Sequence, residues 1–506
     1  MRKRIEYGVL WLSLVLGLCI GSGQAGVSWD EVTYFDFSDH VRAWWQRGAP
    51  LDAAALEEAW AYDRYLNPHP ALMRALSALT ATLSGLAFPT NYRLATLMVC
   101  AGLLTGLYAL LWRKLGRAGA MLAVLAVVLQ PRVYGDVLNA TCDAPVALAF
   151  AVLCLLGWRI VQVEPHERPA LRASIYLTYG LATAVKFTGL LAIGPVALYF
   201  AWRKQVRELV WAAGAVVWAL CFLILTSPDR WDEPVAGVVA FVTYPFTRSA
   251  VPISTMYLGE RYPFYLPWHY FDVMTALTLP MPVLLSLPFV VLIVPRLRGL
   301  AAALCFPLGF WLLLVHLPNT PRHDGVRQFL SVMPLLGLLG TLGVVSAVER
   351  VCARVPPMRA RLWSHASLSA AAGALVLSFV PWVRVPLSSY NALAGGLSGA
   401  EALGLETTYF LEVVSPAFLA RVNRVLRPGD SLMLIPQWPG LLRRYQAEGV
   451  LRQDVTVVDD LRQTPRYLLL VRRRSVVNDE LFLGLAPVLQ TGHDDVVLAK
   501  LTKRAR

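Results

Sequence analysis

The chain has 506 residues, of which 57% are hydrophobic and 16% are charged. A soluble domain carries about 45–50% apolar and about 25% charged residues, so this composition excludes an ordinary water-soluble protein. The net charge of +13 would suggest nucleic acid in a soluble protein, but the basic residues here form short clusters between apolar runs, which is typical of cytoplasmic loops. We therefore expect the lipid bilayer, and no nucleic acid, as a partner.

Continuous apolar runs fill the first 381 residues. About 20 helical residues cross the hydrocarbon core, and only helices or closed barrels satisfy the backbone there. These runs do not alternate, so they predict helices, about eleven in number. The expected spans are residues 8–25, 92–112, 118–130, 144–160, 173–185, 187–201, 209–226, about 276–294, one before and one after the loop 317–327, and 366–381.

The basic clusters that separate these spans all fall on one side, and we assign that side to the cytoplasm. The outer segments are then Gly26 to about Thr90, Pro131–Asp143, Ser227–Tyr270, Leu317–Arg327 and everything from Trp382 onward. The first helix is expected to stay uncleaved, although Gly21–Ala25 would also suit signal-peptide cleavage. We predict a multi-pass protein, in the inner (plasma) membrane of a bacterium, with its C-terminus outside the cytoplasm.

The composition becomes that of a soluble domain at residue 382. Ser415-Pro416 is typical of a helix start, and short apolar runs at Leu432–Ile435, Val455–Val458, Tyr467–Val471 and Val496–Leu498 have the length of strands. We predict two domains, a transmembrane catalytic domain at 1–381 and a small α/β domain at 382–506. None of the seven cysteines forms a CxxC pair, so no disulfide framework or cysteine metal site is expected.

The strongest candidate for chemistry follows the first helix. Asp30 and Glu31 are adjacent carboxylates at the membrane surface, where apolar walls and mutual repulsion favour a general base. The alternative is a helix start, where acidic residues favour the helix dipole.

Four short motifs together resemble a known group. They are Asp30-Glu31 in the first outer loop, the stretch Asn67-Pro68-His69-Pro70-Ala71-Leu72, Asp143-Ala144-Pro145 at a helix entry, and the helix break Lys186-Phe187-Thr188-Gly189. Their order is similar to that in the C-type (GT-C) membrane glycosyltransferases, especially the protein O-mannosyltransferase and lipid A aminoarabinose transferase group. One departure is Ala71, where the group usually has a second proline. The resemblance implies a GT-C-like helical fold with an outer C-terminal domain, a polyprenyl-phosphate sugar donor, and site roles for His69 and Asp143.

An anionic lipid-phosphate headgroup needs cations at the membrane surface. Lys186 lies at a break between two apolar helices, and a lysine in a membrane segment is a functional candidate by default. Arg132, Arg322 and Arg327 are further candidates for binding the donor phosphate, and His323 and Asp324 lie beside them. No HxxH or HExxH spacing occurs, so we assign no metal ligands and no certain cofactor; a divalent metal is left open because some relatives hold one.

The sequence thus predicts inverting sugar transfer at the outer face of the membrane. Asp30 would act as base, Glu31 would support or position it, and Lys186 with outer arginines would neutralise the leaving phosphate. The acceptor is open among a membrane lipid, a protein and a polysaccharide. The alternatives are a transporter or flippase of lipid-linked glycans, a glycan polymerase or ligase, and a non-catalytic membrane scaffold.

Overall fold

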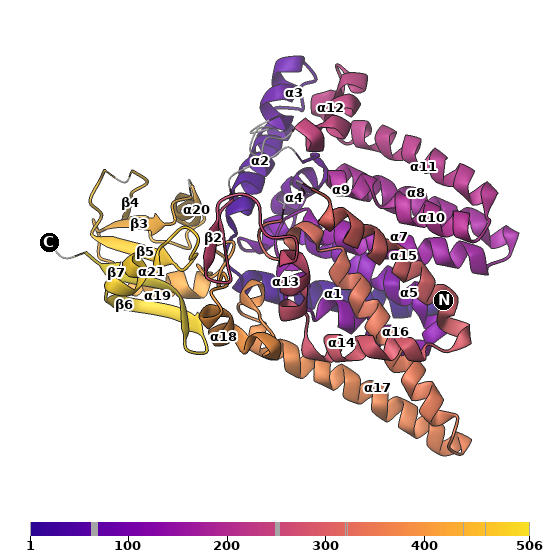
Figure 1. Ribbon diagram of the computed structural model, residues 1–506. Helices are drawn as coiled ribbons and strands as arrows, with labels where there is room; N and C mark the ends of the chain where they lie inside the picture. Colours follow the sequence, from indigo (N-terminus) through magenta and orange to yellow (C-terminus); the bar gives the residue numbers. More distant parts are fainter. Residues whose placement is uncertain are drawn as a thin grey trace.

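The computed structural model describes residues 2–61, 69–247, 253–318, 320, 322–438, 440–460 and 462–504. A helical bundle makes up most of the molecule, and a small sheet lies at the end of the bundle opposite the amino-terminus (Figure 1). Residues 67 and 68 of the predicted His-Pro stretch lie outside the described residues. The expected fold class, a polytopic helical protein with a small α/β domain at its C-terminus, is confirmed.

The first half of the chain forms the amino-terminal helix, three outer helices and the helices that carry the site. These are α1 (Arg2–Gln24), α2 (Trp29–Gln46), α3 (Ala53–Trp60), α4 (Leu72–Leu83), α5 (Thr90–Val128), α6 (Pro131–Leu138), α7 (Asp143–Gln162), α8 (Arg168–Val185), α9 (Phe187–Leu190), α10 (Ile193–Trp202) and α11 (Val206–Leu225). The region expected to be one long outer loop therefore contains α2, α3 and α4.

The second half continues the bundle and then leaves it. It contains α12 (Pro234–Thr247), the hairpin β1 (Thr255–Tyr257) and β2 (Glu260–Tyr262), α13 (Tyr270–Thr278), α14 (Met281–Ser286), α15 (Arg298–His316), α16 (Val332–Cys352), α17 (Pro357–Phe379) and the short α18 (Gly396–Ala402). The long α17 runs along one side of the bundle toward the sheet (Figure 1).

Within the described residues, seven helices are long and apolar enough to cross a membrane, or eight if the bent pair Tyr270–Thr278 and Met281–Leu292 is one span. Each of the eleven expected spans has a helical segment at its place, but α8 and the short α10 are not among those seven helices. The spans 92–112 and 118–130 are both parts of α5, which is broken at Gly116. The count of eleven stays a prediction, and the multi-pass character is confirmed.

The C-terminal sheet has five strands in the order β4-β3-β5-β7-β6. Strand β3 pairs in parallel with β4 and β5, and β7 pairs antiparallel with β5 and β6. The elements are α19 (Pro416–Val425), β3 (Ser431–Ile435), α20 (Leu441–Ala447), β4 (Thr456–Val457), β5 (Tyr467–Val471), α21 (Asp479–Gly484), β6 (Pro487–His493) and β7 (Val496–Lys503). The sequence predicted α19 and four of these strands, and it missed β6, an edge strand that is mostly exposed.

One apolar core runs through both parts of the molecule. It includes Leu104 and Leu148 of the bundle together with Leu419 and Leu469 of the C-terminal part. The segment joining the two parts is itself buried, and residues 404–414 lie almost completely inside. The division at residue 381 stays a prediction, while the packing ties the two parts together.

Candidate active site

Four predicted site residues, distant in sequence, form one chain of ion pairs. The guanidinium of Arg327 contacts the carboxylate of Asp30 and donates from Nε to Oδ2 of Asp143 at 2.9 Å. The other oxygen of Asp143 accepts a hydrogen bond from Lys186 Nζ at 2.5 Å. Two carboxylates and two cations thus alternate, and their formal charges cancel.

Local structure explains why each side chain reaches this point. Asp30 lies in the first turn of α2 and Asp143 begins α7, both favourable places for an acid near a helix dipole. Lys186 has an extended backbone (φ −155°, ψ 148°) between α8 and α9, so it is the break that the sequence predicted. Arg327 follows a turn in which Asp324 and Gly325 both have positive φ.

The two acids of this chain differ in access. The side chain of Asp30 is 32% exposed, whereas that of Asp143 is 4% exposed and holds a cation on each oxygen. A general base must reach the proton that it removes. Asp30 meets this requirement, and Asp143 fits the role of an anchor for Lys186 and Arg327.

Glu31 is completely buried and belongs to a second polar cluster. Its carboxylate accepts two hydrogen bonds from Arg93, at 2.7 Å each, and further bonds from the backbone N–H groups of Ser28 at 2.9 Å and Ala140 at 2.7 Å. Arg93 also donates to the backbone carbonyls of Ser22, Ala25 and Gly26. The Asp-Glu pair is therefore divided, because Asp30 faces Arg327 while Glu31 joins α1, α2, α5 and the turn before α7.

A third acid near the chain of ion pairs is Asp136 on α6. Burial and the neighbouring Asp143 carboxylate raise the pKa of Asp136 to about 7, against the opposing effect of Arg327, Arg132 and Lys186. This side chain therefore carries a proton over much of the acidic range, unlike an ordinary aspartate.

Two comparisons with known proteins bear on this arrangement. Residues 68–231 match the model of the family described as dolichyl-phosphate-mannose-protein mannosyltransferase. The crystal structure of ArnT from Cupriavidus metallidurans bound to undecaprenyl phosphate is similar over 98% of both chains, at 14% identity and a TM-score of 0.53. The chain has the GT-C glycosyltransferase fold. The crystal structure of the same ArnT in the apo state gives a TM-score of 0.52 at 13% identity, over 99% of this chain and 98% of the ArnT chain. No curated protein matches in sequence.

Within this GT-C fold, the other predicted residues lie around the ion-pair chain. His69 is close enough to act electrostatically on Asp143. His323 Nδ1 lies 3.0 Å from Asp324 Oδ2. Although burial opposes ionisation, His323 and two arginines lower the pKa of Asp324 to about 2, so this buried acid is charged.

Two predicted arginines are occupied by the fold. Arg322 donates to the carbonyls of Val315 at 2.7 Å and Leu317 at 3.0 Å, which are unsatisfied acceptors at the end of α15. Arg132 is buried between the rings of Tyr390 and Tyr409 and donates to the carbonyl of a neighbouring serine. Their roles as phosphate ligands stay predictions.

The structure also places residues at the site that the sequence analysis missed. Arg93 lies inside a predicted membrane span, and a charge there is itself a signal for a buried partner. Asp136 and Arg473 had no local signal, because their burial comes from contacts between distant segments.

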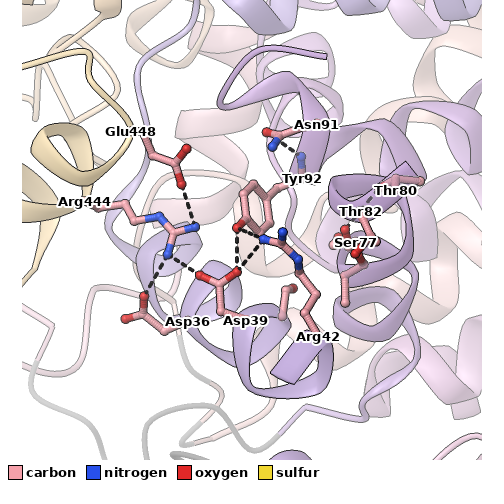
Figure 2. Close-up of polar contacts among 12 residues, drawn as sticks. Asp36, Asp39, Arg42, Ser77, Thr80, Thr82, Asn91, Tyr92, Arg444 and Glu448 are labelled. Atoms are coloured by element: carbon pink, nitrogen blue, oxygen red, sulfur yellow. Dashed lines mark hydrogen bonds and ion pairs between the residues drawn. The ribbon is translucent and has the colours of Figure 1, made fainter. Parts of the chain in front are cut away.

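A second contact joins the C-terminal part to α2 farther along that helix. Arg444 of α20 contacts Asp39 at 2.5 Å and Asp36 at 3.5 Å, and Tyr92 of α5 donates to Asp39 (Figure 2). Glu448, the residue that follows α20, contacts the same guanidinium at 3.0 Å. The middle of the helix that carries Asp30 thus also contacts the C-terminal part.

The sequence left open whether the site residues bind a divalent metal ion. In the part of the chain that the structure describes, no group of three or more His, Cys, Asp or Glu side chains is arranged to hold one. The acids at the site are paired with arginine and lysine, so these residues do not form a ligand set for a divalent metal.

Proposed function

We propose that this protein transfers a sugar from a polyprenyl-phosphate donor to an acceptor at the outer face of the membrane, with inversion at the anomeric carbon. The observation that carries the proposal is the chain Asp30–Arg327–Asp143–Lys186. It places the accessible carboxylate of Asp30 beside Arg327, and Asp143 links Arg327 to Lys186. The undecaprenyl phosphate bound to ArnT supports a lipid-phosphate donor.

In this mechanism, Asp30 accepts the proton of the acceptor hydroxyl or phosphate. The acceptor oxygen attacks the anomeric carbon, and the bond from that carbon to the phosphate oxygen breaks. Lys186 and Arg327 stabilise the charge that develops on the departing polyprenyl phosphate, which is usually the largest catalytic contribution. Arg327 uses one Nη and Nε for the two carboxylates, and a guanidinium has five N–H donors, so it retains capacity for phosphate.

The outer side follows from charge as well as from the site. The start of α2, which carries Asp30, contacts Arg473 and Phe410 of the C-terminal part, and the basic clusters that indicate the cytoplasm lie in other loops. We assign the C-terminal part and the catalytic end to the extracytoplasmic face of a bacterial inner membrane. The acceptor, whether a membrane lipid, a protein or a polysaccharide, and the identity of the sugar stay open.

The test is the variant Asp30→Asn, which keeps the shape of the side chain and removes its basicity. Loss of general-base catalysis lowers turnover by about 100–10,000-fold. The assay follows radiolabelled sugar from polyprenyl phosphate into a membrane acceptor fraction, with expression measured in parallel. Glu57→Gln is the matched control, because it is an exposed carboxylate of the same outer segment and should keep full activity. Near-normal transfer by Asp30→Asn would reject the assignment.

A flippase or a glycan polymerase predicts different results in the same assay. A flippase would move labelled lipid across vesicles without forming a glycosidic bond. A polymerase or ligase would accept donors carrying whole glycans and ignore a single-sugar donor. Transfer of one sugar that depends on Asp30 separates the proposed function from both.

A further inference from the structure

The first residue of α2, Trp29, is held by the C-terminal part of the chain. Its ring lies 4.0 Å from the guanidinium carbon of Arg473, 5.4 Å from the ring of Trp438 and 5.9 Å from that of Phe410. Its backbone N–H also donates to the carbonyl of Phe410 at 3.2 Å. Asp30 is the next residue, so its position depends on these contacts.

Arg473 contacts the other half of the site as well. Its Nη2 lies 3.3 Å from Oδ1 of Asp324, in the turn that leads to Arg327, and another of its nitrogens donates to the carbonyl of Tyr409. The same Nη2 is 3.3 Å from the carbonyl of Ser254, just before the hairpin β1–β2. The side chain is 3% exposed, so these contacts are made inside the protein.

The ring of Phe410 completes the connection. The guanidinium carbon of Arg327 lies 4.8 Å from it, and Phe410 also packs edge-on against Trp29. Arg473 and Phe410 therefore contact the segments on both sides of the Asp30–Arg327 pair. Both Arg473 and Phe410 belong to the part of the chain after residue 381.

We propose that Arg473 is a positioning residue for the Asp30–Arg327 pair and that the C-terminal part is a required component of the active site. The part of this inference that concerns catalysis rests on the proposed function, whereas the part that concerns the position of Trp29 does not. Arg473 is too deeply engaged with protein groups to bind substrate, so it acts through Trp29 and Asp324. A displacement of about 1 Å at a catalytic group can cost about 100-fold in rate.

Arg474 offers a matched control on the same strand end. Its Nη atoms donate to the carbonyl of Glu401 at 2.8 Å and to Asp479 at 3.0 Å, so its side chain holds the C-terminal part together without touching α2. Arg473→Met and Arg474→Met each remove one guanidinium from this region. Only the first removes contacts to the site.

The experiment uses the full chain in nanodiscs and has two readouts. Amide exchange over residues 26–34 should rise about 10-fold or more in Arg473→Met and stay unchanged in Arg474→Met. Without the contacts of Arg473, the start of α2 unfolds locally more often. In the transfer assay, kcat of Arg473→Met should fall about 10–100-fold with a smaller change in the donor KM, since Lys186 keeps its contacts. Arg473→Lys, which retains the charge beside Asp324, should recover part of kcat.

Each outcome decides the inference. Unchanged exchange at 26–34, unchanged kcat in Arg473→Met, or equal losses in both methionine variants would overturn it. If Arg473→Met does not accumulate, Arg473→Lys carries both readouts, and its exchange should lie between that of wild type and that of an unfolded segment. If the wild-type chain transfers no sugar, the proposed function fails, and amide exchange alone decides whether Arg473 holds the start of α2.

Discussion

Adjacent residues at the start of α2 use their carboxylates differently. Asp30 has one cationic partner and partial access to solvent, whereas Glu31 is buried among N–H donors. Glu31 also completes a capping box with Ser28, so the helix-start alternative describes Glu31 well. The structure therefore supports Asp30 as the base and Glu31 as a residue that positions it.

This difference predicts that two conservative variants affect stability unequally. Glu31→Gln leaves the guanidinium of Arg93 buried without its countercharge, and breaking such a buried pair costs about 3–5 kcal/mol. Its thermal unfolding temperature in detergent should drop clearly, while that of Asp30→Asn stays close to wild type. If Glu31→Gln unfolded like wild type, the structural role of this cluster would be wrong.

Asp136 should make stability depend on pH. Its pKa in the folded protein is about 7, above the ordinary value of 3.8. The folded protein therefore binds this proton more tightly than the unfolded chain does. The resulting stabilisation is complete when the pH is below the ordinary pKa, and it is lost as the pH rises through the pKa of the folded protein. As the pH rises from 4 to 8, the unfolding temperature of the wild type should fall relative to that of Asp136→Asn. Parallel curves for the two proteins would contradict this prediction.

At the scale of elements, the membrane helices were easier to predict than the outer ones. Long apolar runs identify spans by composition alone, and each expected span has its helical segment. Helix α2 was expected to be loop because acidic, aromatic and basic residues alternate along it without one apolar stripe. It forms because its apolar side chains are buried: Phe35 packs in the main core, and Val41 and Trp44 pack against α3 and α4.

The break in α5 depends on a single glycine. Gly116 has φ 73° and ψ 172°, a conformation that is almost restricted to glycine, and an added Cβ there would meet no other atom within 4 Å. Gly116→Ala should therefore destabilise the protein by about 1–3 kcal/mol through backbone strain alone. The matched control is Gly102→Ala in a helical part of α5, where the added Cβ would meet only a tryptophan nitrogen at 3.9 Å. Equal unfolding temperatures for the two variants would show that the break needs no glycine.

At the scale of the whole molecule, the C-terminal part packs against the end of the bundle that carries the proposed active site. Contacts from Phe410, Arg473 and Arg444 reach α2 at two places more than one helical turn apart. These contacts bring the C-terminal part against the segment that carries Asp30. A fragment that begins near residue 390 would expose the buried segment 404–414, so isolated expression is a poor test of its fold.

The orientation in the membrane can be tested with single cysteines. Arg113 is exposed beside the break in α5, and the Arg462 side chain is 94% exposed in the C-terminal part. A membrane-impermeant maleimide added to intact cells should label Arg462→Cys and should label Arg113→Cys only after permeabilisation. The unsubstituted chain corrects for its own seven cysteines. The reverse pattern would invert the topology.

The sequence by itself determined the membrane class, the multi-pass character and four of the residues that meet in the chain of ion pairs. Membrane helices and their orientation depend on the hydrophobicity and charge of short stretches of chain, so a local window of sequence is enough to predict them. Only the tertiary structure decided which charges pair. Burial joined Glu31 to Arg93 and Asp143 to Lys186, and it brought Arg473 to Trp29 across more than 400 residues of chain. An ion pair depends on distance and on exclusion of water, and neither is a property of a local sequence window.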